Sequence, residues 1–259
     1  MTVLFCVPYA GGSARVYRGW QKWFAGDAEV VPLELAGRGT RSTEPVAPSV
    51  RAAAADLARR VRDIAAGRPY VLFGHSMGSL IAYEMAATIE DAAGDGPSLV
   101  VVSGRNPPQT RANWGDDALM LTDLELFEAL QAVGGVPAGL TPSIAAALFV
   151  PLIRADLNNT VSYDPGSPPR RISAPLLVLL GREDPLVGPD AGAGWASCTQ
   201  RECTVVRHEG RHFSIFERVG ELAETLRPFL ARGHERTAPG DAGVGCIAGK
   251  PAGPVGSDV

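Results

Sequence analysis

Six short apolar segments constrain the fold of this 259-residue chain more than any other feature. They are rich in β-branched residues, contain few polar residues, and are separated by stretches with helical patterns. The segments are residues 2–8, 28–35, 70–75, 98–104, 175–181 and 203–209. A strand buried on both faces has a nearly continuous apolar sequence, as in a parallel sheet covered by helices on both sides. We therefore expect an α/β fold with a mostly parallel central sheet, whose functional residues lie at the carboxyl ends of the strands.

Helices are predicted at residues 49–66, 78–93 and 217–232. In the first of these, Val50, Leu57 and Val61 follow a helical period, and arginines occupy the other side. These helices alternate with the apolar segments, as the parallel sheet requires.

Residues 105–174 are too many for a simple crossover between two strands. Two helices are predicted there: 122–133, where Thr122 and Asp123 can cap the first turn, and 142–161, which Pro151 should kink or divide. A helical insertion over the strand ends would be a lid. The alternative is that these helices only cover an edge of the sheet. We expect one α/β domain over residues 1–232 and a disordered Gly-, Ala- and Pro-rich tail over 233–259.

The composition excludes several classes of protein. Apolar residues make up 46% and charged residues 20% of the chain, with a net charge of −4, which is typical of globular proteins and does not favour nucleic-acid binding. The N-terminus is a poor signal peptide, and no apolar stretch is long enough to span a membrane. We expect a cytoplasmic protein. The four cysteines form no CxxC pair, so neither a metal site nor a disulfide framework is expected.

The stretch "GHSMG", residues 74–78, lies between a predicted strand and a predicted helix. Gly-x-Ser-x-Gly in that context is the nucleophile elbow of α/β hydrolases, which exposes the serine at the end of the sheet. The turn is strained, and side chains at Gly74 and Gly78 would prevent close packing. Ser76 is therefore the predicted nucleophile, and the backbone N–H of Met77 is a predicted oxyanion donor.

A serine nucleophile needs a histidine base. Of the four histidines, His75 adjoins the serine but should point away from it, and His234 lies in the tail. His208 and His212 remain. We favour His212, because it lies in the loop ahead of the last helix, where the chain order Ser, acid, His places the base.

An acid must orient that histidine. Asp184 follows the fifth apolar segment in "LLGREDPLV" and is the predicted acid; the adjacent Glu183 should project differently. The second oxyanion donor should come from the loop after the first strand, "PYAGGSARVYRGW", and we assign it to the Ala10 N–H.

Seven motifs in order resemble the type II, or external editing, thioesterases of polyketide and nonribosomal peptide assembly lines. They are "FCVPYAGGSA", "LELAGRGTR", "FGHSMGSLIAYEMA", "LVVVSGRNPP", "ALQAVGGVP" with "PLIRADL", "LLGREDPLV" and "GRHFSIFE", and the resemblance covers about residues 2–230. It implies hydrolysis of an acyl group linked to the phosphopantetheine arm of an acyl or peptidyl carrier protein, without a further cofactor. It also implies that Ser76 forms an acyl-enzyme, that His212 moves the proton, and that Asp184 orients His212.

The chain departs from the family pattern at "AGR" (36–38), where "PGR" is more common, and at "GRH" (210–212), where "GGH" is frequent. Cyclising thioesterases often carry their aspartate after the strand that follows the elbow, and here that place reads "SGRNPP" without an acid. The sequence thus favours the hydrolytic type. The alternatives are a general carboxylesterase or lipase acting on oxygen esters, and a hydrolase fold retained as a binding module.

Further expectations concern substrate and partner. Tyr9, Phe127 and Phe149 are candidate substrate-binding residues, together with Leu130, Leu148 and Ile153 as possible lining of the acyl chamber. An acidic carrier protein would favour a local basic patch, for which the candidates are Arg15, Arg18, Lys22, Arg38 and Arg41. We expect a monomer.

Overall fold

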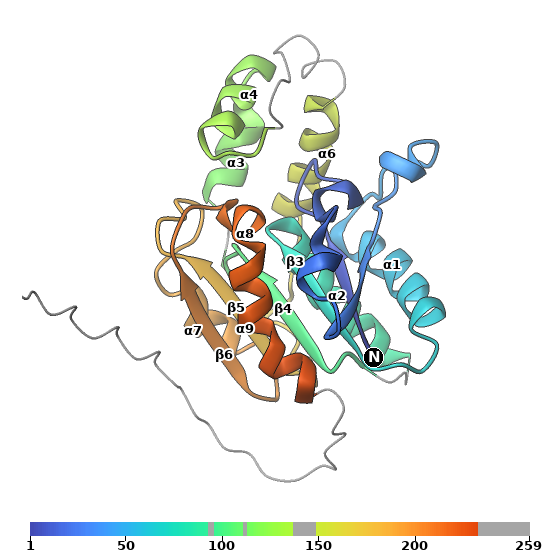
Figure 1. Ribbon diagram of the computed structural model, residues 1–259. Coiled ribbons are helices and arrows are strands. Elements are labelled where there is room, and N and C mark those ends of the chain that lie inside the picture. Colours follow the sequence, from blue (N-terminus) through green and yellow to red (C-terminus); the bar gives the residue numbers. More distant parts are fainter. Residues whose placement is uncertain (93–95, 111–112, 137–148, 233–259) are drawn as a thin grey trace, which may run out of the picture.

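The computed structural model describes residues 1–92, 96–110, 113–136 and 149–232. Its centre is a six-stranded parallel sheet with the order β2-β1-β3-β4-β5-β6 (Figure 1). The strands are β1 (Thr2–Val7), β2 (Ala28–Pro32), β3 (Tyr70–His75), β4 (Leu99–Ser103), β5 (Leu176–Gly181) and β6 (Cys203–His208). Each strand lies within one of the six predicted apolar segments, so the expected parallel α/β fold is confirmed.

Both faces of the four inner strands, β1, β3, β4 and β5, are buried, which accounts for their continuous apolar sequences. In β1, Val3, Phe5 and Val7 belong to one core, whereas Leu4 and Cys6 belong to the other. The first core packs under helices α1 (Val50–Ala65), α2 (Met77–Asp91) and α7 (Ala191–Ala196). The second packs under α8 (Ser214–Glu217), α9 (Val219–Arg232) and the 3₁₀ helices η1 (Ala14–Tyr17) and η2 (Trp20–Trp23). A further 3₁₀ turn, η3, spans Gly39–Arg41.

The three predicted flanking helices correspond to α1, α2 and α9. The sequence did not predict α7, α8 or the 3₁₀ helices, which are only three to six residues long and show no repeated helical period.

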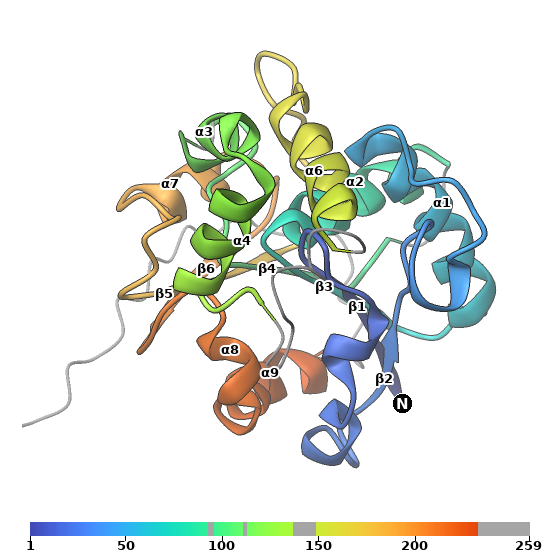
Figure 2. The ribbon, with the colours of Figure 1, turned by 90° about the horizontal axis from the view of Figure 1, so that it is seen from above.

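Three helices, which we call the cap helices, lie over one end of the sheet (Figures 1 and 2). They are α3 (Asn113–Met120), α4 (Asp123–Ala132) and α6 (Val150–Val161), and they share a small apolar cluster of their own. Thr122 caps α4 as predicted: its backbone N–H donates to Glu125 Oε2 at 2.8 Å, and its hydroxyl accepts the N–H of Glu125.

The predicted effect of Pro151 needs correction. Pro151 lies in the first turn of α6, where a backbone N–H has no partner within the helix, so proline begins this helix instead of kinking it. Residues 142–148 of the predicted helix and the predicted tail, 233–259, fall outside the described residues. Within the described ranges, every helix is too short or too polar to cross a membrane.

Candidate active site

Ser76 occupies a sharp turn between β3 and α2. Its backbone angles, φ 53° and ψ −118°, lie in a region that residues with side chains rarely adopt and that costs about 1–3 kcal/mol. The turn is fixed by a hydrogen bond of 2.8 Å from the Ser76 N–H to the carbonyl of Ser103, at the end of the neighbouring strand β4. This geometry is that of the predicted elbow.

The two flanking glycines permit this turn. A Cβ at Gly74 would lie 2.0 Å from the carbonyl oxygen of Gly78, and a Cβ at Gly78 would lie 2.3 Å from the carbonyl oxygen of Val7. Both neighbours are backbone atoms that cannot move aside independently. Only hydrogen fits at either position, as expected from the motif.

The structure brings Asp184 and His212 together. Asp184 Oδ2 lies 2.8 Å from His212 Nδ1, and both side chains are buried. The other carboxylate oxygen accepts the backbone N–H of Leu186 at 2.9 Å, which fixes the orientation of the acid. A carboxylate oxygen can accept a hydrogen bond from an N–H at His212 Nδ1, and in that tautomer Nε2 is free to act as a base. His208 is more exposed, and its Nδ1 lies 3.1 Å from the Glu209 carbonyl, outside this pair.

Ser76 and His212 line the same cavity, whose empty space, including a part that is open solvent, is about 730 Å³. The lining residues are Tyr9, Ala10, Ser76, Met77, Gly104, Arg105, Asn106, Leu130, Val133, Ile153, Leu157, Thr160, Leu186, His212 and Phe213. The structure therefore gathers the predicted nucleophile, base and both predicted oxyanion residues at one site.

Not every predicted substrate-binding residue lies at this cavity. Tyr9, Leu130 and Ile153 line it, but Phe127 and Phe149 do not. Phe127 is buried, and Phe149 packs against the apolar cluster of the cap helices. Leu148 lies outside the described residues. In the described part of the chain, no group of three His, Cys, Asp or Glu side chains is placed to hold a metal ion.

His75 packs against His212, and it is not among the residues that line the cavity with Ser76. Its ring centroid is 4.8 Å from that of His212, and its Nδ1 lies 3.0 Å from the Ser103 hydroxyl. Burial lowers the pKa of His75 well below its ordinary value, and the nearby His212 lowers it further. His75 is therefore neutral at pH 7. It packs against the imidazole of His212 and does not take up the proton that His212 would accept.

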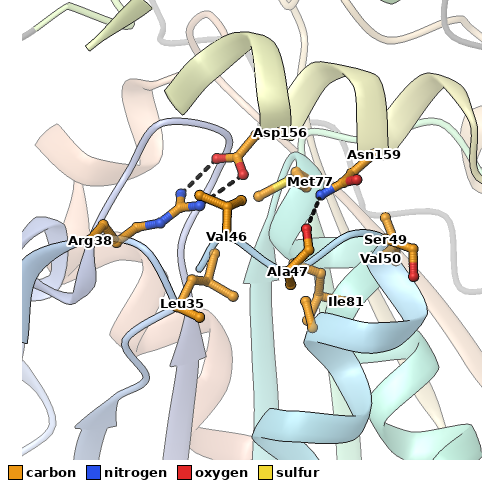
Figure 3. Close-up of a pocket in the computed structure, with 12 residues that line it drawn as sticks. Leu35, Arg38, Val46, Ala47, Ser49, Val50, Met77, Ile81, Asp156 and Asn159 are labelled. Carbon is orange, nitrogen blue, oxygen red and sulfur yellow. Dashed lines mark hydrogen bonds and ion pairs between the residues drawn. The ribbon is translucent and has the colours of Figure 1, made fainter. Parts of the chain in front are cut away.

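A buried ion pair between Arg38 and Asp156 (Figure 3) links the cap helices to the loop that contains Ala10. Arg38 Nη1 and Nη2 lie 2.6 and 2.8 Å from the two carboxylate oxygens of Asp156 on α6, and the side chains are 5% and 3% exposed. Asp156 Oδ2 also accepts the Gly11 N–H at 2.7 Å, and Arg38 donates to the Gly12 carbonyl at 3.2 Å. Helix α6 therefore holds the backbone next to Ala10.

Sequence reasoning missed this pair. Both residues stand in motifs that carried the family resemblance, "LELAGRGTR" and "PLIRADL", but they are 118 positions apart. No local pattern indicates that two distant charged residues will meet.

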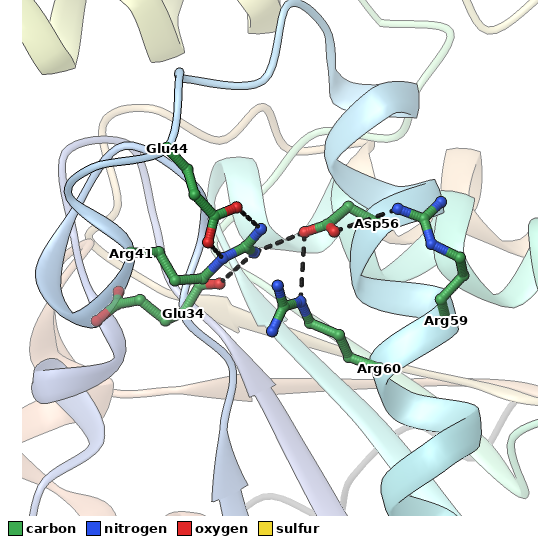
Figure 4. Close-up of polar contacts among 6 residues, drawn as sticks. All are labelled: Glu34, Arg41, Glu44, Asp56, Arg59 and Arg60. Carbon is green, nitrogen blue, oxygen red and sulfur yellow. Dashed lines mark hydrogen bonds and ion pairs between the residues drawn. The ribbon is translucent and has the colours of Figure 1, made fainter.

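Arg41 is also neutralised by carboxylates (Figure 4). Its Nε lies 2.8 Å from Glu44, its Nη1 lies 2.6 Å from Asp56 on α1, and the hydrogen bond to Glu44 is the main cause that raises its pKa. Arg38 and Arg41 are thus not free to meet an acidic partner. Of the predicted basic patch, the exposed residues are Arg15, Arg18 and Lys22, which form no ion pair with the described residues.

Comparison with known proteins agrees with this geometry. Residues 2–230 match the thioesterase domain family. Gramicidin S biosynthesis protein GrsT of Aneurinibacillus migulanus is 30% identical over 224 residues, which are 86% of each chain. The crystal structure of ClbQ from the colibactin NRPS/PKS pathway superposes with a TM-score of 0.82 at 27% identity, covering 90% of this chain and 99% of ClbQ. The type II thioesterase BorB of the borrelidin biosynthetic cluster superposes with a TM-score of 0.74 at 27% identity, covering 88% of this chain and 92% of BorB. The chain therefore belongs to the thioesterase domain family and is a hydrolase that acts on thioesters.

Proposed function

We propose that this chain is a type II thioesterase that removes aberrant or stalled acyl groups from the carrier proteins of a polyketide or nonribosomal peptide synthase. The observation that carries the proposal is the buried Asp184–His212 pair on one cavity with the strained Ser76. The biosynthetic pathways of GrsT, ClbQ and BorB support this class of pathway. The substrate is an acyl thioester on a phosphopantetheine arm.

In the first half-reaction, Ser76 Oγ attacks the thioester carbonyl while His212 Nε2 takes the hydroxyl proton. Asp184 accepts the hydrogen bond from His212 Nδ1 and stabilises the imidazolium that forms. The tetrahedral intermediate collapses as its C–S bond breaks, and His212 returns the proton to the departing thiolate. The products of this step are the free carrier thiol and an ester on Ser76.

The oxyanion of the intermediate is stabilised by the backbone N–H groups of Ala10 and Met77. Met77 is the first residue of α2, so its N–H is not used within the helix and the positive end of the helix dipole faces the same point. Both residues line the cavity with Ser76. Removing one such donor typically costs about 10²–10³ in kcat.

In the second half-reaction, water replaces the thiol. His212 Nε2 takes a proton from water, the hydroxide adds to the acyl-enzyme carbonyl, and the Ser76 ester bond breaks with return of the proton to Oγ. The free acid leaves, and the enzyme is restored. No step needs a metal or a cofactor beyond the phosphopantetheine arm of the substrate.

The carrier protein would meet the exposed Arg15, Arg18 and Lys22 around η1 and η2. An acidic carrier surface is attracted by unpaired cations, which raises the rate of encounter. The adjacent loop carries Ala10, so a carrier placed here would direct its arm toward the cavity. We propose that the chain acts as a monomer.

The second candidate is a carboxylesterase acting on small oxygen esters, because the same triad serves both reactions. Release of free thiol from an acylated carrier protein distinguishes the two candidates when a p-nitrophenyl ester of the same acyl group is run in parallel. We expect the carrier thioester to be the better substrate by kcat/KM and Ser76→Ala to lose ~10³-fold or more. A higher kcat/KM for the oxygen ester would favour the esterase.

A further inference from the structure

The side chain of Asn106 connects the loop after β4 to the loop after β5. Asn106 stands three positions beyond the end of β4, in the stretch "SGRNPP". Its Nδ2 donates to the Leu186 carbonyl at 3.2 Å, and its Oδ1 accepts the Gly188 N–H at 2.8 Å. Asn106 is only 8% exposed. The donor and the acceptor of its amide are therefore both bonded to the backbone of the loop that follows Asp184.

The backbone around Asn106 is a fixed support for this amide. The carbonyl of the preceding residue, Arg105, accepts the indole N–H of the fully buried Trp195 at 2.9 Å. Asn106 is followed directly by Pro107. A residue before proline is largely restricted to extended backbone. Asn106 can therefore hold the neighbouring loop in one place.

The turn that carries the predicted acid has only long backbone hydrogen bonds of its own. The Asp184 nitrogen lies 3.4 Å from the Gly181 carbonyl oxygen, and the Val187 nitrogen lies 3.5 Å from the Asp184 carbonyl oxygen. Both distances exceed the usual 2.7–3.2 Å of such bonds. The shorter bonds of the turn involve side chains: Asp184 Oδ1 accepts the Leu186 N–H at 2.9 Å, and Asn106 holds the Leu186 carbonyl. The position of the turn therefore depends on these side chains.

The contacts run without a gap from Asn106 to the base. Asn106 bonds the carbonyl of Leu186, and the N–H of the same Leu186 bonds Asp184 Oδ1. The other oxygen of that carboxylate, Oδ2, lies 2.8 Å from His212 Nδ1. From this geometry we infer that Asn106 is a positioning residue, which holds Asp184 against His212. The inference rests on the proposed function, because it concerns the acid and the base of that reaction.

Asn106 also lines the cavity, so contact with the substrate is the other role that its place allows. The two roles affect different kinetic constants. A misplaced acid leaves substrate binding intact and lowers kcat, and a displacement of about 1 Å can cost ~10²-fold. Loss of a group that only binds the substrate raises KM with kcat unchanged. Because both polar groups of the amide are already bonded to the backbone, we expect the first result.

The test replaces the amide and measures hydrolysis of an acyl-carrier thioester. Asn106→Leu keeps the approximate size but leaves the Leu186 carbonyl and the Gly188 N–H without their partner. We expect kcat to fall by about 10–10²-fold with little change in KM. Asn106→Asp keeps the shape and can accept the Gly188 N–H, but its carboxylate cannot donate to Leu186. It should lower kcat as well, and it replaces Asn106→Leu if circular dichroism shows that the latter does not fold.

Gln109→Leu is the matched control. Gln109 is an amide in the same loop, and its Nε2 bonds the Gly194 carbonyl at 2.9 Å and the Ser197 hydroxyl at 3.1 Å. These partners belong to α7 and its end, and neither contacts the acid. Gln109→Leu therefore removes comparable hydrogen bonds and should keep the wild-type kcat.

A second comparison distinguishes positioning from a general structural role. If Asn106 acts through Asp184, its removal should cost little once the acid is gone, because residues that act as a unit give non-additive losses. We expect kcat of Asp184→Ala/Asn106→Leu to lie within about twofold of that of Asp184→Ala. With Asn106→Asp as the second change, the expectation is the same.

Three results would overturn the inference. The first is a wild-type kcat in the Asn106 variants, and the second is a raised KM with unchanged kcat, which would make Asn106 a substrate contact. The third is the same fold loss in the Asp184→Ala background as in wild type, which would make its role structural only. In each case, hydrolysis by the wild type that depends on Ser76 would leave the proposed function standing. Turnover at the wild-type rate by Ser76→Ala would reject the proposed function itself.

Discussion

The ion pair between Arg38 and Asp156 should serve both stability and catalysis, and the two effects can be separated. Asp156 accepts two hydrogen bonds from Arg38 and one from the Gly11 N–H, all at 2.6–2.8 Å and all buried. Asp156→Ala leaves an arginine that is 5% exposed without a counter-charge. Losing one partner of a buried pair costs about 3–5 kcal/mol, so we expect that decrease in the free energy of unfolding.

The double variant Arg38→Met/Asp156→Leu removes both charges. It should be more stable than Asp156→Ala, because no unpaired charge remains. It still lacks the acceptor for the Gly11 N–H, so the neighbouring Ala10 donor should be poorly placed. We expect kcat for a carrier thioester to fall by at least about tenfold, toward the 10²–10³ that loss of one oxyanion donor costs, with a smaller change in KM.

Urea denaturation followed by circular dichroism measures the first effect, and steady-state kinetics measures the second. Glu29→Ala is the control. Glu29 forms an ion pair with Arg68, but the two side chains are 40% and 39% exposed, so this pair should contribute less than about 1 kcal/mol. If Asp156→Ala cost no more than this control, or if the double variant kept wild-type kcat, the pair would not anchor the oxyanion loop.

Three further predictions follow from the site. Gly74→Ala should lower the free energy of unfolding by about 1–3 kcal/mol or more in urea denaturation, because the added Cβ would lie 2.0 Å from a backbone carbonyl oxygen. The control Gly188→Ala should be nearly neutral, because the nearest atom to its Cβ would be 3.5 Å away. Equal effects of the two substitutions would contradict the packing argument. The pKa of His75 is lowered in the native state. At a pH below its ordinary pKa of 6.5, the unfolded chain therefore binds a proton at this residue that the native state does not bind. The free energy of unfolding should then decrease as the pH falls, by up to about 1.4 kcal/mol per pH unit. His75→Gln should reduce this slope in denaturation curves between pH 6.5 and 4.5, and an unchanged slope would refute the assignment. Arg15→Glu/Arg18→Glu should raise KM several-fold for a carrier-bound substrate but not for a small thioester analogue, and equal changes in both KM values would exclude docking through these residues.

Local patterns were sufficient for the sheet and the elbow. Strands buried on both faces have a continuous apolar sequence, and a serine between two glycines at a strand–helix turn is typical of a nucleophile elbow. Asp184 and His212 could be chosen because chain order in this fold limits where the acid and the base can lie. In these cases the signal is contained in a few adjacent residues or in their order.

The features that the sequence did not reveal depend on contacts between distant segments. The partner of Arg38 is 118 positions away, and nothing near either residue marks the pair. The inward faces of the cap helices were equally hard to predict, because short apolar helices offer several faces of similar hydrophobicity. Leu130 and Ile153 therefore line the cavity, whereas Phe127 and Phe149 pack elsewhere.

The central claim is that Ser76 carries the acyl group between the two half-reactions. Intact-protein mass spectrometry after brief mixing with an acylated carrier protein, followed by peptide mapping, tests it directly. We predict a mass increase equal to the acyl group, located on the peptide that contains Ser76 and absent from Ser76→Ala. Turnover of the carrier thioester by Ser76→Ala at the wild-type rate, or an acyl group found on another residue, would contradict the account.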